Sequence, residues 1–399
     1  MYARKAFDAI SLFHDELTAL RRDIHAHPEL GFNENRTSDL VARSLVALGY
    51  EVHRGIGKTG VVGVLEGRRN TSGRSIGLRA DMDALPILEQ TEAAHASVNS
   101  GVMHACGHDG HTAVLLGAAR YLAETRNFDG KLVLIFQPAE EGMGGAQAML
   151  DDGLFDRFPC DAIYALHNWP GLPAGTIGVN PGPAMAAADH FEIHIEGRGG
   201  HGAHAYQTND PIVIAAHLIT ALQTIVSRNV AATDAAVITV ASVSAGSLPA
   251  MNVIPRDARM TGTVRTFSPV VQAKVERRMQ EVVQGVAATF QAKIELKYHH
   301  LFPATINTPE HARLVVDVAT ELFGAEQVVS NLVPSMGSED FSVVLLQRPG
   351  AYFRLGQGGA EAGHVLHSAT FDFNDAVIPV GSAVFCRLVE RSMPLDHAK

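Results

Sequence analysis

The apolar positions of this 399-residue chain follow two alternating spacings. Steps of three and four residues, which are typical of amphipathic helices, occur over residues 6–22, 37–48, 112–124, 309–323 and 380–391. Short apolar runs of the length of buried strands lie between these helices, at residues 61–65, 75–80, 131–136, 161–166 and 351–355. Strands that alternate with helices in this way predict an α/β domain.

A different order of elements is predicted in the middle of the chain. Strand, helix, strand, strand, helix and strand follow one another over residues 189–195, 210–226, 236–243, 257–265, 268–290 and 292–298. This βαββαβ order is that of the ferredoxin-like unit. We therefore expect two domains: an α/β domain of residues 1–186 and 300–399, and an inserted α+β domain of residues 187–299.

Composition excludes several classes of protein. Apolar residues make up 46% of the chain and charged residues 19%, as in ordinary globular proteins. A net charge of −10 without a basic run argues against a nucleic-acid-binding surface. Three scattered cysteines fit a reducing compartment better than a disulfide framework. No apolar run approaches the roughly 20 residues of a membrane span, and the N-terminus has no apolar signal core. We expect a cytoplasmic protein without a membrane partner.

Metal-ligand side chains gather where three of the predicted strands end. In chain order these side chains are Asp81 and Asp83, then Glu140 and Glu141, then His167. Open α/β sheets bind ligands at the carboxyl ends of their strands, so these groups are expected to meet although they are distant in sequence.

The segment from His104 to His111 brings three histidines, a cysteine and an aspartate into eight residues. The spacing of Cys106 and His108 lets a tight loop direct both side chains at one ion, and thiolate and imidazole are good ligands for zinc and its neighbours. Taken alone, the segment is equally compatible with a histidine-rich loop that caps the next helix. His104 and His111 are expected to support the loop.

The candidate ligands exceed what one tetrahedral zinc requires and suit two divalent ions that share a ligand. They are Cys106, His108, Glu140, Glu141, His167 and His367. Successive side chains diverge, so one of the two adjacent glutamates is expected to bind metal while the other acts as general base. Zinc, manganese, cobalt and nickel all suit this mixed ligand set.

A glycine-rich run at residues 197–202 fits the pattern G-x-G-x-x-G. The next helix is predicted to begin only near residue 210, whereas a dinucleotide fingerprint opens directly into its helix. This distance argues against a nucleotide-dependent enzyme, which is one alternative for the chain.

The chain resembles the M20 metallopeptidase clan, and within it the subgroup of aminoacylases, hippurate hydrolases and auxin-conjugate amidohydrolases. The matching motifs span nearly the whole chain in the family's order, at residues 23–30, 78–86, 104–111, 137–142, 166–168, 199–201, 252–255, 336–341 and 367–368. The resemblance implies a metallopeptidase-type catalytic domain with an inserted lid, through which the chain forms a homodimer or homotetramer.

The resemblance also assigns roles within the predicted site. It implies two divalent metals bridged by Cys106, with Glu140 as the general base. The remaining metal ligands would be His108, Glu141, His167 and His367. Asp81 and Asp83 would orient a ligand imidazole from behind.

Three residues of the inserted domain would serve the substrate. His201 would donate to the oxyanion across a dimer, and Asn252 and Arg265 would contact the substrate. Arg265 fits a structural salt bridge equally well.

The function implied is a metal-dependent amidohydrolase that cleaves N-acyl amino acids, hippurate-like or N-acetyl, with Glu140 activating the attacking water. A dipeptidase or a deacetylase of the same clan is the alternative. A non-catalytic metal-binding protein of the same fold is a more distant one, and Glu140 argues against it because such a protein needs no general base.

Overall fold

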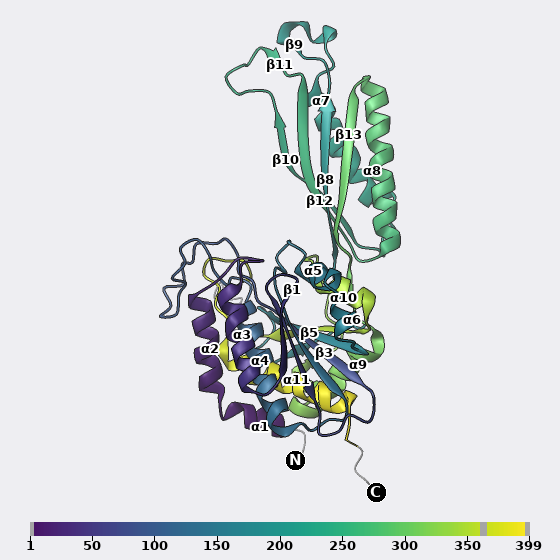
Figure 1. Ribbon diagram of the computed structural model, residues 1–399. Coiled ribbons are helices and arrows are strands. Elements are labelled where there is room, and N and C mark those ends of the chain that lie inside the picture. The colour runs from purple at the N-terminus through teal and green to yellow at the C-terminus, as the bar shows by residue number, and fades with distance from the viewer. Residues whose placement is uncertain (1–3, 360–364, 396–399) are drawn as a thin grey trace. The chain divides into compact units, whose positions relative to one another are not determined.

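The computed structural model describes residues 4–359 and 365–395, which form two compact units (Figure 1). The first unit contains residues 1–184, 306–333 and 340–399, and the second contains residues 185–305 and 334–339. The predicted domain boundaries at residues 187 and 299 stay a prediction.

An eight-stranded mixed sheet, in the order β1-β2-β4-β3-β5-β16-β6-β15, forms the centre of the first unit. Its strands are β1 (Glu51–Ile56), β2 (Gly60–Glu66), β3 (Ser75–Asp81), β4 (Lys131–Gln137), β5 (Ala162–Trp169), β6 (Ile177–Gly178), β15 (Val328–Val329) and β16 (Gly350–Gly356). The central strands β4, β3, β5 and β16 run parallel. Their carboxyl ends therefore lie at one edge of the sheet, as the sequence predicted for its ligand-bearing strands.

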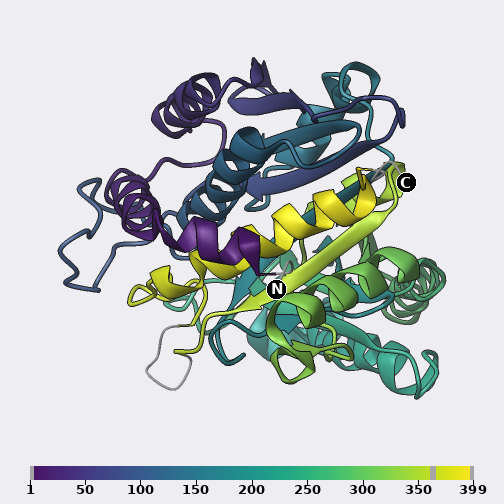
Figure 2. The same ribbon diagram turned by 90° about the horizontal axis from the view of Figure 1, so that it is seen from below.

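Helices complete the first unit on both sides of this sheet. They are α1 (Lys5–Ser11), α2 (His14–Ala26), α3 (Asn35–Ala47), α4 (His108–Thr125), α5 (Gly145–Asp151), α6 (Leu154–Arg157), α9 (Pro309–Phe323), α10 (Phe341–Gln347) and α11 (Ile378–Ser392). Helix α11 packs against α4, and the view from below shows it in yellow across the unit (Figure 2).

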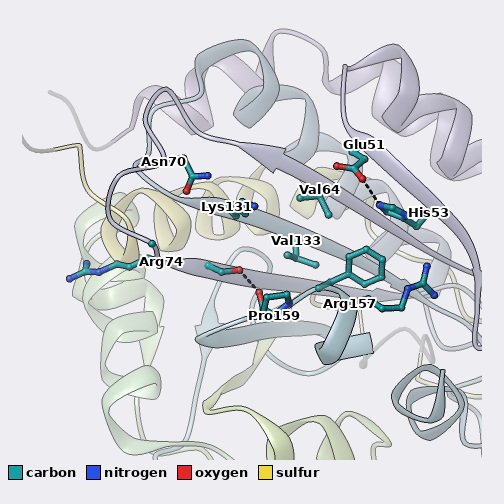
Figure 3. A pocket seen from close by; sticks show the side chains of 12 residues that line it. Glu51, His53, Val64, Asn70, Arg74, Lys131, Val133, Arg157 and Pro159 are labelled. Carbon is teal, nitrogen blue, oxygen red and sulfur yellow. Dashed lines mark hydrogen bonds and ion pairs between the residues drawn. The ribbon is translucent and has the colours of Figure 1, made fainter. Parts of the chain in front are cut away.

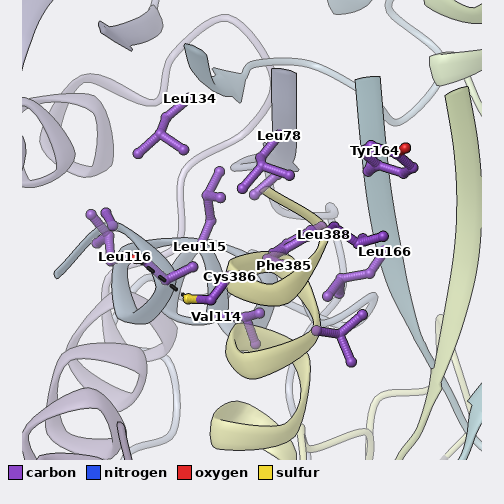
Figure 4. Close-up of a cluster of buried hydrophobic side chains, with 14 of the residues drawn as sticks. Leu78, Val114, Leu115, Leu116, Leu134, Tyr164, Leu166, Phe385, Cys386 and Leu388 are labelled. Carbon is purple, nitrogen blue, oxygen red and sulfur yellow. Dashed lines mark hydrogen bonds between the residues drawn. The ribbon is translucent and has the colours of Figure 1, made fainter. Parts of the chain in front are cut away.

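The core of the first unit lies between the sheet and these two helices. Leu78, Leu134 and Leu166 from the strands meet Leu115 of α4 and Phe385 of α11, all of them buried (Figure 4). Burial of large apolar side chains in this way stabilises a fold by roughly 1.5–3 kcal/mol per side chain. The core fixes the sheet against α4, whose first turn carries His108.

Two predicted helices differ from the structure, and strand β1 was not predicted. The predicted helix over 6–22 is two helices, because the amides of Leu12 and Phe13 bond to carbonyls three residues back and the chain turns there. Helix α4 begins at His108 instead of residue 112. Strand β1 was not predicted, because its edge position leaves most of its side chains at least partly exposed and so gives no apolar run.

The second unit has a four-stranded antiparallel sheet in the order β10-β12-β8-β13. Its elements are β8 (Ala187–Glu196), β9 (Gly200–His201), α7 (Pro211–Arg228), β10 (Ala236–Ala245), β11 (Val253–Ile254), β12 (Asp257–Thr266), α8 (Pro269–Phe290) and β13 (Lys293–Phe302). The main strands and helices follow the predicted βαββαβ order. Short strands β7 (Pro183–Met185) and β14 (Thr305–Ile306) occur where the chain enters and leaves this unit.

Helix α7 is amphipathic in its burial. Ile214, Leu218 and Leu222 are buried in the core of the second unit, whereas Ile212 and Val213 are about half exposed. By length and composition alone α7 could cross a membrane, a test that core helices of soluble proteins also pass.

Candidate metal centre

The turn before α4 directs Cys106 and His108 into the same region. Gly107 between them has a φ of +92°, a conformation that glycine adopts readily and other residues rarely. A Cβ on Gly107 would lie 2.5 Å from Oδ1 of Asn168. The loop can pass this close to β5 only with glycine at this position.

Two groups of potential ligands share Cys106. Its sulfur lies with His108 and His167 in one group and with Glu141 and His367 in the other, and within each group all ligand atoms lie within 4.8 Å of one another. The structure thus brings together the five ligands predicted from the sequence. A further group joins Glu140 to His108 and Glu141.

Two imidazoles of the cluster are oriented by hydrogen bonds from Nδ1 to backbone carbonyls. Nδ1 of His108 donates to the carbonyl of Asp83 at 2.9 Å, and Nδ1 of His167 donates to the carbonyl of Asn168 at 2.7 Å. These bonds occupy Nδ1 of each ring and leave Nε2 for a metal, and Nε2 of His167 lies 3.4 Å from the sulfur of Cys106. Within the described ranges, Nε2 of His108 is buried and has no hydrogen-bond partner. A buried ring nitrogen that lacks a hydrogen-bond partner fits a metal ligand.

The charges of the cluster also fit a cation. Burial, together with the carboxylates of Glu141 and Glu140, holds the pKa of the Cys106 thiol well above its usual range. Ionisation of Cys106 would add a further negative charge to an already acidic, buried cluster. A divalent cation compensates this charge, so binding of metal and loss of the thiol proton are coupled.

Asp83 and Asp81 lie behind the candidate ligands. Asp83 is 3.3 Å from Nδ1 of His108 and accepts the backbone amide of Glu141 at 3.0 Å. Asp81 accepts a hydrogen bond from Nδ1 of His111 at 2.6 Å and one from the guanidinium of Arg79 at 2.7 Å. Although burial opposes it, His108, His111 and Arg79 hold the pKa of Asp81 well below its usual range.

His111 and Asn168 extend this support. Nε2 of His111 accepts the backbone amide of Asn168 at 3.0 Å, so the ring bridges Asp81 and strand β5. Sequence reasoning gave His111 only a general support role and did not single out Asn168. The signal that could have identified Asn168 is its place directly after the predicted ligand His167.

His367 reaches the cluster from the C-terminal part of the chain. Its amide donates to the carbonyl of Ala105 at 2.8 Å, and its Nε2 lies 3.2 Å from a carboxylate oxygen of Glu141. The backbone of His367 has a φ of +63°. A non-glycine residue rarely adopts this conformation, and such strain concentrates at functional sites.

The three remaining predicted residues belong to the second unit. His201 is exposed on the short strand β9, where its ring accepts the amide of Ala203 at 3.1 Å. The carbonyl of Asn252 accepts the amide of Gly202 at 2.8 Å, so Asn252 lies beside His201. Arg265 is partly buried on β12, and among the described residues it has no ion pair. Burial lowers the pKa of Arg265, and the negative charge of Asp189 opposes this shift. The salt-bridge interpretation of Arg265 therefore stays open.

A separate hollow of about 730 Å³ opens at the opposite end of the strands. Ser75 and Lys131, the first residues of β3 and β4, line it together with His53 and Arg157 (Figure 3). None of the candidate ligands borders this hollow, so it is not part of the metal centre.

Known proteins match the chain over most of its length. The family described as Peptidase family M20/M25/M40 matches residues 77–391. Hippurate hydrolase of Campylobacter jejuni is 42% identical over 373 residues, 94% of this chain and 95% of that enzyme. N-acetylcysteine deacetylase of Bacillus subtilis is 40% identical over 378 residues, 94% of this chain and 96% of that enzyme.

A solved structure matches as well. The Bacillus subtilis YXEP protein, described as a dinuclear metal binding peptidase from the M20 family, has a TM-score of 0.83 at 36% identity. The match covers 96% of this chain and 99% of that one.

Proposed function

The chain belongs to peptidase family M20/M25/M40, and on this premise we propose that it is a metal-dependent amidohydrolase of N-acyl amino acids. It cleaves the amide bond to give a carboxylate and a free amino acid. The relatives named hippurate hydrolase and N-acetylcysteine deacetylase, at 42% and 40% identity, support this substrate class. The observation that carries the proposal is the pair of ligand groups that share Cys106, with the acid Glu140 beside them.

The donor set fits two divalent ions. Cys106 would bridge them, with His108 and His167 completing one ligand set and Glu141 and His367 the other. When bound, ions of this kind polarise an amide carbonyl and bring the pKa of water toward about 7. Zinc, manganese, cobalt and nickel are all compatible with sulfur, imidazole and carboxylate ligands together.

Glu140 is the general base of this proposal. Its carboxylate is buried, and one oxygen lies 3.4 Å from the backbone amide of Asp340. Glu140 takes a proton from the attacking water and returns it to the nitrogen of the leaving amine. Its neighbour Glu141 is the proposed metal ligand, because Glu141 belongs to the ligand group of Cys106 and His367 and Glu140 does not.

Three residues of the second unit are proposed to contact the substrate. The exposed imidazole of His201 is proposed to donate to the oxyanion, a role typically worth about 3–4 kcal/mol. Asn252, beside it, and Arg265 are proposed to bind the substrate. The cation of Arg265, which has no ion pair among the described residues, suits the carboxylate of an acyl amino acid.

The test is the variant Glu140→Gln. Metal content should remain at two ions per chain, while kcat falls by about 10²–10⁴-fold, the contribution of a general base. Glu141→Gln is the matched control and should lose metal as well as activity. Wild-type turnover by the Glu140→Gln enzyme would remove the mechanism.

A substrate panel tests the reaction itself. Hippurate and N-acetyl amino acids should be hydrolysed faster than dipeptides when each candidate metal is added back to the apoprotein. A preference for dipeptides would instead favour a dipeptidase of the same family.

We also propose that the chain forms a homodimer through its second unit and works in the cytoplasm. Strand β10 is at the edge of its sheet, and Tyr206, Leu248 and Met251 are more than four-fifths exposed. Exposed apolar side chains and a free strand edge are features of surfaces that bind another chain. Light scattering should give twice the chain mass, and Met251→Glu with Leu248→Glu should give monomers; a tetramer would indicate a second interface.

A further inference from the structure

The turn between β4 and α5 carries both the proposed base and a proposed ligand. Ala139, directly before Glu140, has a φ of +52°, which places a non-glycine residue in the left-handed region. The amide of Gly145 donates to the carbonyl of Ala139 at 3.0 Å. This conformation determines the direction in which the Glu140 side chain leaves the backbone, so whatever holds Ala139 also aims the base.

Glu34 contacts this turn from a distant part of the chain. One oxygen of its fully buried carboxylate accepts the backbone amide of Ala139 at 2.8 Å, across 105 residues of sequence. The other oxygen accepts the hydroxyl of Thr59. A buried carboxylate is costly unless its oxygens are hydrogen-bonded, so these contacts define its orientation.

The position of Glu34 suggests that it caps helix α3, but its contacts argue against this role. Glu34 immediately precedes α3, at the N-cap position, where a side-chain oxygen commonly accepts an amide of the first turn. Its side chain makes no capping hydrogen bond. The carboxylate of Glu29 instead accepts the amides of Arg36 and Thr37 in the first turn of α3, both at 2.9 Å. The capping task is done by Glu29, and Glu34 is directed at the turn.

Asp340 holds the flanks of the same turn. Its buried carboxylate accepts hydrogen bonds from the side-chain amide of Gln137 at 2.7 Å and from the backbone amide of Ala146 at 2.9 Å. Gln137 precedes the turn and Ala146 follows it. Asp83 accepts the amide of Glu141 at 3.0 Å. Three buried carboxylates from separate segments thus hold the turn, and Glu34 holds the residue that precedes the base.

We propose that Glu34 is a positioning residue for Glu140: it holds the left-handed conformation of Ala139 and thereby aims the carboxylate of the base at the substrate. The proposal rests on the assignment of Glu140 as the base of the proposed amidohydrolase. It goes beyond that function, because among the described residues the carboxylate of Glu34 is hydrogen-bonded to Ala139 and Thr59, and neither is a proposed metal ligand.

Glu34→Ala and Glu34→Gln separate this role from simple support of the fold. In Glu34→Gln the amide oxygen still accepts from Ala139 and the amide group can donate to Thr59, so kcat should stay within about twofold of wild type. Glu34→Ala should lower kcat by about 10–100-fold, the usual effect of losing a supporting contact. KM and the metal content of two per chain should change little, and the acidic limb of the kcat profile against pH should shift.

Glu29→Ala is the matched control, because it removes the cap of the same helix without touching the turn. It should lower the melting temperature and leave kcat unchanged. If Glu34→Ala does not fold, Glu34→Asp serves in its place, since the shorter side chain keeps the charge but does not reach Ala139. Wild-type kcat in the Ala or Asp variant overturns the proposal, as does an equal loss in Glu34→Gln or a loss explained by missing metal.

Hydrogen exchange gives a readout that does not depend on activity. The amide of Ala139 should exchange faster in Glu34→Ala than in wild type or Glu34→Gln. If the wild-type enzyme hydrolyses no acyl amino acid, the proposed function fails while this measurement still decides whether Glu34 holds the turn. Equal exchange in all three proteins overturns the proposal.

Discussion

Gly110, in the first turn of α4, shows how closely the turn that carries Cys106 and His108 is packed. A Cβ at this position would lie 2.3 Å from ring atoms of Phe373. Gly110→Ala should therefore displace the turn that carries His108, at a cost of about 1–3 kcal/mol for overpacking. We expect a lower melting temperature and weaker metal retention during dialysis against a chelator.

A second glycine provides the control for Gly110. Gly285 lies in helix α8 of the second unit, and a Cβ there would meet nothing within 4 Å. Gly285→Ala should stabilise the protein by about 0.4–1 kcal/mol through the unfolded chain and leave metal binding unchanged. Normal metal retention in Gly110→Ala would show that the loop can move away from Phe373.

Cys106 is the residue on which the two-metal arrangement depends. Because it belongs to both ligand groups, Cys106→Ala should reduce the metal content from two ions to one or none, measured by elemental analysis of the dialysed protein. Cys106→Asp restores a negatively charged bridging side chain and should recover part of the loss. Two tightly bound ions in Cys106→Ala would argue against a bridging thiolate.

At the scale of residues, the side-chain types indicated which residues would gather as candidate ligands, but they did not indicate which residues support them. Cys106, His108 and Glu141 are side chains that bind metals wherever they converge, and strand ends and motifs indicated where they would. The role of Glu34 depends instead on which backbone amide its oxygen meets 105 residues away. No pattern of residue types encodes such a contact before the chain is folded.

At the scale of elements, α2 is joined to the start of α4 by buried charges. Both ring nitrogens of His25 face carboxylates, Nδ1 that of Asp109 at 2.8 Å and Nε2 that of Glu89 at 3.2 Å. Burial lowers the pKa of His25 and nearby Arg21 opposes its charge, but Asp109 and Glu89 outweigh both and raise the pKa to about 9. The imidazolium therefore ties α2 to α4 and to the loop that carries Glu89.

This shift predicts how stability depends on pH. The folded-state pKa of about 9 lies above the ordinary value of 6.5, so the stabilisation is fully present below pH 6.5 and is lost as the pH rises through 9. The melting temperature of wild type should exceed that of His25→Gln most at pH 6, and the difference should shrink by pH 9.5. The pair of partly exposed His53 with exposed Glu51 provides the control, because His53→Gln should change the melting temperature little. A difference for His25→Gln that does not vary with pH would contradict a charged imidazole.

Elements that bury an apolar face were predictable, and those that do not were missed. Strand β4 reads as a continuous apolar run because all but its first residue are buried. Strand β1 has only its last residue buried, so its pairing with β2 left no trace in the pattern. The break between α1 and α2 was missed for a related reason: Ile10 and Phe13 keep helical spacing, although the chain turns between them.

At the scale of the whole molecule, the second unit has its own core. Phe191 and Ile193 of β8 pack with Leu218 of α7 and Met279 of α8, all nearly fully buried. The order of secondary structure alone predicted this unit, because a βαββαβ segment closes its sheet without strands from elsewhere. No comparable pattern indicated that residues 334–339, from a distant part of the chain, join the second unit.

The two units should therefore be separable. Ala188 pairs with Phe302 on neighbouring strands, so the ends of residues 188–302 lie close together, and a short Gly-Ser linker can replace this segment. All five proposed ligands belong to the first unit, so the shortened chain should still bind two metals. Its hydrolysis of acyl amino acids should fall by at least about 10²-fold, because the proposed oxyanion donor His201 is gone.

His201→Ala in the full chain should keep both metals and account for part of this fall. A shortened chain that loses its metals would contradict the proposed ligand set, and one that hydrolyses at the wild-type rate would contradict the proposed role of His201.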